Sequence, residues 1–386
     1  MANKQLVILT RNLVKPGRPL LCPIYKADGT LLAQKGVVLT EEQVAILDGY
    51  PQLYTQGKAL SAAISPSRFV QEWDENERYK RRSPFVRLEE LRNDLIRVLQ
   101  DPLDGDNLQC IETIMRRLEV IVGEAPDAAL ATVIMDQQEH YAAQHAIHVA
   151  ILCLLTVDFL GWDAQHRHAL LAAALTMNLS LGLLQNDLQE QKQELTPQQE
   201  RIIRRHPEAS RALLEELGVE DENWLDYVEM HHESIDGTGY PKGLVGHEIR
   251  LGASLLQLAD VYCAKVIGRS YRDPLAPPVA ARTIFLGQGQ KKRLDTTEVL
   301  LKVVGLYPPG CQVLLENGEI AIVIKRGTRV DAPHVRSILD SQGRRYQASI
   351  LRDTANRAFA IKGVVEPHVL KYDPEFARLW GYDPGE

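Results

Sequence analysis

The chain has 386 residues, enough to bury a sizeable core and to form two or three domains. Its net charge of −7 provides no general attraction for nucleic acid, so neither DNA nor RNA is expected as a partner. Its five cysteines are scattered and form no CxxC pair, which argues against a disulfide framework and a cysteine zinc site and favours a cytoplasmic protein.

The pattern of apolar residues predicts no membrane span. Near the N-terminus the apolar run is too short for a signal peptide or an anchor, and Arg11 ends it. The longest apolar stretch, 146–160, contains His148 and Asp158 and is shorter than the roughly 20 residues that cross a bilayer.

Residues 1–60 predict a small α+β module. Short strands are expected at 20–25, 29–32 and 36–39, because they flank turn formers such as Asp28-Gly29. A capping box of Thr40 and Gln43 then predicts the start of a helix. No catalytic constellation occurs in this module, and its sequence assigns it no ligand.

A polar linker and helices are expected over 61–126. Apolar residues recur there with a period of 3.6, which predicts amphipathic helices that serve packing or a dimer surface rather than a site. The two stripes are Leu88, Leu91, Leu95 and Val98, and Ile111, Ile114, Met115, Leu118 and Ile121.

The middle of the chain, 127–295, places several histidines on predicted helices. One helix is expected over 138–155, with His145 and His148, and another over 165–175. Leu195-Thr196-Pro197-Gln198-Gln199 predicts a capping box, and the helix that it starts is expected to end at Arg205-His206-Pro207-Glu208. Taken one at a time, such histidines are more often core or surface residues than ligands.

The most informative stretch is His231-His232-Glu233-Ser234-Ile235-Asp236-Gly237-Thr238-Gly239-Tyr240-Pro241-Lys242-Gly243. Its histidines end an apolar-periodic helix, so both imidazoles can point into a helical bundle. The glycines and the proline then stop the helix and build a compact loop. Asp260 follows inside an apolar helix, where a carboxylate is costly unless it is paired or bound to a cation.

This stretch resembles the signature of the HD-GYP family, the HD-superfamily phosphohydrolases that degrade cyclic di-GMP. The runs HHE and DGTGYPKGL are present as that family has them, and the resemblance covers about residues 127–285. It implies a mainly α fold, an HD-superfamily helical bundle with small N-terminal α+β and C-terminal β-rich subdomains. Two hairpin signals place the β-rich part over 296–372, before a tail at 373–386.

The resemblance also implies functional residues, of three kinds. The implied metal ligands are His145, His206, His231, His232 and Asp260. Substrate contacts fall on Arg269 and Lys242, although a plain salt bridge fits Arg269 equally well. The implied partner-binding loop contains Gly239, Tyr240 and Pro241.

The position that names the family is altered. Members have H-D-x-G-K where this chain has Met177-Asn178-Leu179-Ser180-Leu181. Asn178 offers a neutral oxygen in place of a bridging carboxylate, and the Met177 thioether suits copper(I) better than iron, manganese or zinc. Leu181 removes a lysine that would neutralise phosphate. We therefore expect at most one divalent ion (Fe, Mn or Zn), or none, with His206, His231 and His232 as its ligands.

Three functions follow from this altered motif. The first is a degenerate HD-GYP-type signalling protein that is catalytically impaired and binds cyclic di-GMP, a related nucleotide, or a partner such as a diguanylate cyclase (GGDEF) protein. The alternative is a metal-dependent cyclic di-GMP phosphodiesterase that stays active with a mononuclear site. The third is a structural or dimerisation module, a homodimer whose Asp260 is ion-paired with His145 or His231.

Overall fold

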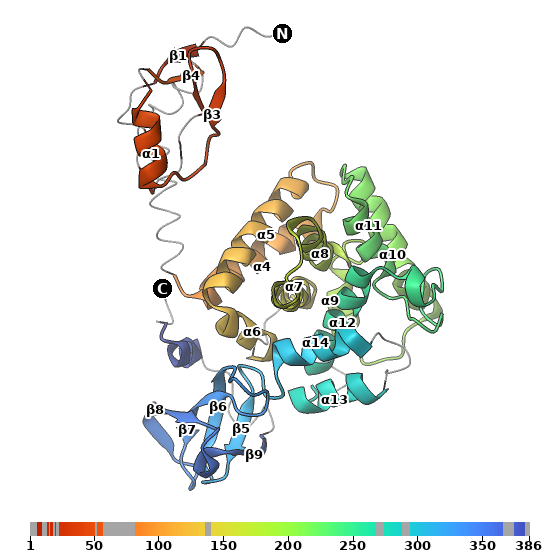
Figure 1. Cartoon of the computed structure of the whole chain (residues 1–386). Helices are drawn as coiled ribbons and strands as arrows, with labels where there is room; N and C mark the ends of the chain where they lie inside the picture. The colour runs from red at the N-terminus through yellow and green to blue at the C-terminus, as the bar shows by residue number, and fades with distance from the viewer. Residues whose placement is uncertain are drawn as a thin grey trace. The chain divides into compact units, whose positions relative to one another are not determined.

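The computed structural model describes residues 6–9, 14, 16–17, 20, 23–50, 52–56, 82–135, 140–267, 274–287, 294–365 and 374–382. The chain divides into two compact units, Met1–Arg81 and Arg82–Glu386 (Figure 1). The finer division expected from the sequence, with boundaries near 60, 126, 295 and 372, stays a prediction.

The first unit contains a small antiparallel sheet and one helix. Its strands are β1 (Leu6–Ile8), β2 (Ile24–Tyr25), β3 (Leu31–Ala33) and β4 (Tyr54–Gln56), in the order β1-β4-β2-β3, and its helix is α1 (Glu41–Asp48). The capping box expected of Thr40 and Gln43 is present at the start of α1. Sequence patterns missed β1 and β4, because three residues are too few to show an alternation.

The strand expected at 36–39 is wrong. Gly36 has a φ of +87°, so it forms a turn instead of extended backbone. Its N–H donates to the Leu20 carbonyl, and the Leu20 N–H donates to the Val37 carbonyl, so the segment is held by isolated hydrogen bonds.

The second unit is a helical bundle built around one central helix. Figure 1 shows α7 nearly end-on, surrounded by other helices, and α7 contacts α4, α5, α6, α8, α9, α12 and α14. The helices are α4 (Pro84–Gln100), α5 (Asn107–Glu124), α6 (Pro126–Met135), α7 (Tyr141–Leu160), α8 (Ala164–Thr176), α9 (Leu184–Glu190), α10 (Pro197–Glu216), α11 (Glu222–Met230), η2 (Gly246–Glu248), α12 (Leu251–Val266), α13 (Pro277–Gly287) and α14 (Leu294–Val304).

The apolar character of α7 is explained by its position in the bundle. Every residue from Tyr141 to Val157 is buried. The helix has 20 residues, so the expectation that it is too short to cross a bilayer is wrong. However, 83% of its most apolar window is enclosed by the rest of the protein, as in the core helix of a globular bundle.

The helices on either side of α7 follow the sequence patterns closely. All nine apolar residues of the two predicted stripes, on α4 and α5, are buried in the same core as α7, so they serve packing. The α8 and α11 helices are joined by a hydrogen bond of 2.8 Å from the Trp224 indole N–H to the Thr176 hydroxyl. This bond fixes the helix that carries the histidine doublet against the bundle.

A five-stranded antiparallel sheet follows the bundle. Its strands are β5 (Gln312–Leu315), β6 (Ile320–Lys325), β7 (His334–Leu339), β8 (Arg345–Asp353) and β9 (Ile361–Val364), in the order β8-β7-β6-β5-β9, with η3 (Arg357–Phe359) and η4 (Pro374–Trp380) beside them. Both predicted hairpins are present, with Gly318 and Gly343 at positive φ in their turns. The mainly α fold class with small β-containing parts is confirmed.

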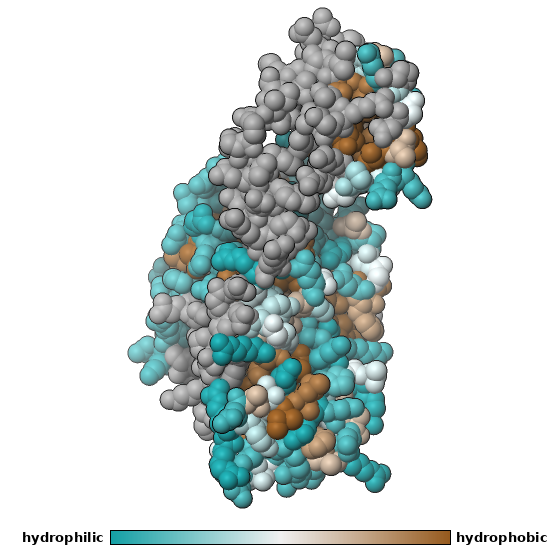
Figure 2. Space-filling view, turned by 90° about the vertical axis from the view of Figure 1, so that its left-hand side faces the viewer, coloured by the Kyte–Doolittle hydropathy of each residue, from teal (hydrophilic) through white to brown (hydrophobic). Residues whose placement is uncertain are grey.

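The surface in Figure 2 is mostly hydrophilic, as expected of a chain in which a quarter of the residues are charged. Hydrophobic side chains are nevertheless visible on the first unit, where Leu31, Val38 and Ile46 are exposed.

Two leucines of α7 test how far the fold depends on this helix. Leu152 is fully buried, and Leu160 on the same helix is 38% exposed. Leu152→Ala should lower the free energy of unfolding by about 2–5 kcal/mol, because it leaves a cavity in the core. Leu160→Ala, the matched control, should cost roughly 0.5 kcal/mol or less. Urea denaturation measures both, and equal losses would contradict the central role of α7.

Candidate metal centre

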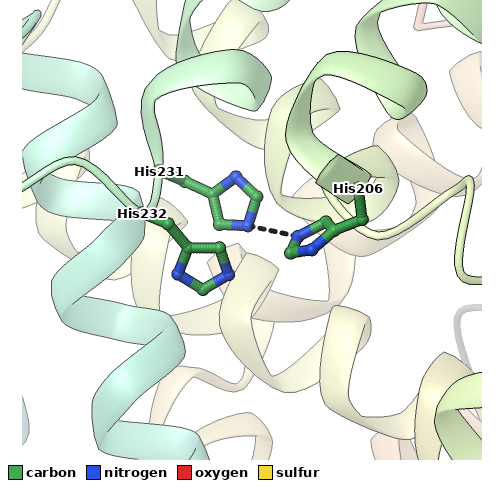
Figure 3. Close-up of side chains that lie close together, drawn as sticks. All are labelled: His206, His231 and His232. Atoms are coloured by element: carbon green, nitrogen blue, oxygen red, sulfur yellow. Dashed lines mark hydrogen bonds between the residues drawn. The ribbon is translucent and has the colours of Figure 1, made fainter. Parts of the chain in front are cut away.

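One histidine on α10 and two directly after α11 meet at one point in the bundle (Figure 3). His206 lies on α10, His231 directly follows α11, and His232 is the next residue; their ligand nitrogens all lie within 4.8 Å of one another. The Nε2 atoms of His206 and His231 are 3.1 Å apart. Two nitrogens on one tetrahedral zinc ion lie about 3.3 Å apart, so this spacing suits a single ion.

The orientation of His206 depends on the proline that follows it. The α10 helix continues through Pro207 to Glu216, so the expectation that it ends at Arg205-His206-Pro207-Glu208 is wrong. Because proline has no N–H, the Ile203 carbonyl lacks its usual helical partner. The His206 Nδ1–H donates to this carbonyl at 2.6 Å, which turns Nε2 toward the other histidines.

His231 is oriented in a similar way. It caps the C-terminus of α11, and its Nδ1–H donates to the Val228 carbonyl in the last turn at 2.6 Å. Both Nε2 atoms therefore direct lone pairs at each other. Burial, together with nearby His231, lowers the pKa of His206 to about 3, and burial also lowers the pKa of His231. A second proton is thus disfavoured on either ring, and a metal ion fits between them.

His145 and Asp260 form a separate hydrogen-bonded pair. His145 on α7 donates through Nε2 to Asp260 on α12 at 2.7 Å, and the Tyr141 hydroxyl lies 3.3 Å from the other ring nitrogen. Burial by itself would raise the pKa of Asp260, but the His145 bond and the neighbouring histidines hold it below its usual range. Within the described part of the chain, neither residue joins the group of three.

The three apolar residues of the altered motif, Met177, Leu179 and Leu181, are buried. Met177 is 1% exposed at the end of α8, and Leu181 is also buried. Half-buried Asn178 accepts the Leu181 N–H at its backbone carbonyl, which forms a turn. Ser180 and Ser210 then fasten this turn to α10: the Ser210 hydroxyl donates to the Ser180 hydroxyl, which donates to the His206 carbonyl, each at 3.0 Å.

Glu233 organises the loop that follows the doublet. Its carboxylate, 2% exposed, accepts the backbone N–H groups of Lys242, Gly243 and Leu244 at 2.7, 3.1 and 2.9 Å. At Gly239 a Cβ atom would lie 2.3 Å from the Ser234 nitrogen, so only glycine fits. The sequence prediction gave Glu233 no role, although an acid before a run of turn formers is a usable signal.

Tyr240 brings this loop against the histidines. Its ring stacks on His232 with 4.7 Å between ring centroids, and the Arg204 guanidinium lies 5.3 Å from the Tyr240 centroid. Lys242 instead pairs with Glu229 at 2.8 Å. The other predicted substrate contact, Arg269, lies outside the described residues.

The chain is similar to proteins of known family. Residues 128–297 match the HD domain family. A cyclic di-GMP phosphodiesterase of Pseudomonas aeruginosa is 28% identical over 221 residues, which cover 57% of this chain and 53% of that protein. Cyclic di-GMP phosphodiesterase PdeB of Borreliella burgdorferi is 24% identical over 187 residues, which cover 48% of each chain.

The chain belongs to the HD-GYP family. The HHE and DGTGYPKGL runs and the HD domain that contains them carry this assignment. This HD-GYP protein spans about half the length of the curated relatives named above. A solved structure, an HDG"Y"P protein from Bdellovibrio bacteriovorus, is 15% identical with a TM-score of 0.49 and covers 78% of this chain and 99% of its own.

Loss of the Glu233 charge should loosen the loop of this HD-GYP protein. Glu233→Gln should cost about 1.5–3 kcal/mol of unfolding free energy, because hydrogen bonds to a charged group are replaced. Hydrogen exchange at the amides of 242–244 should become faster. Glu248→Gln, which alters a single exposed cap at Val245, is the control and should leave those amides unchanged. Unaltered exchange in Glu233→Gln would show that the loop does not depend on this carboxylate.

His148 should make the metal-free protein sensitive to acid. Burial, then His145 and Arg92, lower its pKa from 6.5 to about 3. Between pH 6.5 and pH 3, His148 therefore binds a proton in the unfolded chain but not in the folded one. Its contribution to the free energy of unfolding is fully present above pH 6.5 and is lost as the pH falls toward 3. At pH 5 the loss is about 2 kcal/mol.

Urea unfolding at pH 7 and pH 5 measures how much unfolding free energy is lost through His148. The difference between the two pH values should be smaller by about 2 kcal/mol in His148→Met, which keeps the volume of the side chain. His166→Met, which alters a half-buried histidine outside the core, serves as the control and should keep the wild-type difference. Identical pH dependence in all three proteins would rule out the effect.

Proposed function

We propose that this HD-GYP protein binds cyclic di-GMP at a site built around a single metal ion, and that it hydrolyses little of it. The observation that carries the proposal is the contrast between two parts of the site. His206, His231 and His232 keep converging nitrogens, whereas the motif that should supply a second ion has Met177 in the apolar core.

The three histidines would hold the ion, and a bound ion supplies positive charge for a phosphodiester and an activated water. A second ion close by needs a bridging carboxylate to offset the repulsion between two dications. Asn178 is neutral, and Asp260 is engaged by His145. Loss of even a supporting partner costs roughly ten- to a hundredfold in affinity or activity, and loss of direct ligands costs more.

A cyclic dinucleotide is favoured as the ligand by the relatives and by the loop. The relatives include phosphodiesterases named for cyclic di-GMP and, in Vibrio cholerae, one named for 3'3'-cGAMP. The Tyr240 ring stacks on His232, so the GYP loop contributes to the wall of the site. This contact supports nucleotide binding more strongly than capture of a diguanylate cyclase by Gly239, Tyr240 and Pro241.

A mononuclear phosphodiesterase is the second candidate. It is favoured by the same three nitrogens, because three histidines with an open fourth position are typical of mononuclear hydrolytic zinc sites. The third candidate, a structural module, is favoured only by the His145–Asp260 pair, which holds α7 to α12 without a metal.

Elemental analysis and a cyclic di-GMP assay on one chelator-free preparation test these alternatives. The expected result is one ion per chain, measurable cyclic di-GMP affinity by calorimetry, and product at background. Robust conversion to linear pGpG or GMP that disappears in His231→Ala would establish the phosphodiesterase instead. A protein with neither metal nor nucleotide affinity would be the structural module.

A variant with restored ligands extends this test. Met177→His combined with Asn178→Asp should bind a second ion and raise turnover more than tenfold. Met177→Leu combined with Asn178→Ala, which offers no ligand, is the control. Turnover that stays at background despite two bound ions would mean that the altered motif is not what limits hydrolysis.

A further inference from the structure

The positive side chains near the three histidines differ in what they contact. Lys242 is paired with Glu229, a buried carboxylate that Arg211 also contacts at 3.3 Å. The charge of Lys242 is therefore partly neutralised by Glu229 within the protein. Leu181 stands where the family has a lysine, so that position contributes no charge.

Arg204 is different. It is exposed on α10, two residues before His206, and its guanidinium lies 5.3 Å from the centroid of Tyr240. The same ring stacks on His232 and lies 6.5 Å from the His206 ring. Within the described ranges no carboxylate forms an ion pair with Arg204, although Glu200 and Glu208 lie one helical turn away on either side.

We propose that Arg204, held over the Tyr240 ring, contacts a phosphate of the bound cyclic dinucleotide outside the metal centre. A guanidinium stacked on an aromatic ring keeps its edge N–H groups available, and their planar fork matches two phosphate oxygens. A cyclic dinucleotide has two phosphodiesters, and an ion that contacts one of them leaves the other without a cationic partner. Arg204 would supply the charge that Leu181 does not, so this inference rests on the proposed function and names a contact within it.

Calorimetric titration of the full, manganese-loaded chain with cyclic di-GMP tests the proposal. Arg204→Gln should raise Kd at least tenfold. Arg204→Lys keeps the charge but loses the planar fork, so it should fall between wild type and Arg204→Gln. Arg205→Gln is the matched control: Arg205 is also exposed on α10 but points about 100° away, and its loss should change Kd less than twofold.

The outcomes distinguish a failure of the Arg204–phosphate contact from a failure of the proposed cyclic di-GMP binding. An unchanged Kd in Arg204→Gln, or equal losses in Arg204→Gln and Arg205→Gln, overturns the proposal. Should wild type fail to bind cyclic di-GMP, the proposed function fails, and pyrophosphate becomes the probe. Binding of pyrophosphate that Arg204→Gln weakens tenfold would then still support a phosphate contact at Arg204. Absence of binding to both probes overturns the contact as well. Thermal unfolding checks that the variants keep the wild-type Tm.

Discussion

Two short hydrogen bonds to helix carbonyls orient two of the three histidines that meet in the bundle. The Nδ1–H groups of His206 and His231 donate to Ile203 and Val228, and the two Nε2 atoms are left 3.1 Å apart. Neither carbonyl has a normal helical partner, since one precedes a proline by four residues and the other lies in the last turn of a helix. The bundle around α7 supplies the dry setting in which two such lone pairs favour a cation.

The altered motif is part of the folded structure. Met177 and Leu181 are packed in the core, and Ser180 connects their turn to α10 through Ser210 and the His206 carbonyl. In a site with two ions, the metals themselves would join these two elements. Here hydroxyl groups and apolar packing join them. The Met177–Leu181 segment therefore connects α8 to α10 through its own side chains.

Much of the fold could be predicted from the sequence, because apolar period, capping boxes and hairpin turns are local signals. The stripes of α4 and α5, the caps of α1 and α10 and both C-terminal hairpins are such cases. The continuation of α10 past Pro207 was missed, because a local rule cannot see that the freed Ile203 carbonyl accepts from His206. Glu233 and Arg204 were missed because their partners come from a folded loop, and spacing along the chain does not reveal them.

The Glu233 carboxylate connects the loop to the candidate metal centre. Glu233 directly follows His232, and its carboxylate accepts hydrogen bonds from three consecutive amides of the loop. The same loop stacks the Tyr240 ring on the His232 imidazole. A shift of the loop therefore moves the His232 imidazole, and an ion held at His232 would stiffen the loop in return. If an ion bound at the histidines and a nucleotide at the loop, thermodynamic reciprocity would require each to change the affinity of the other by the same factor.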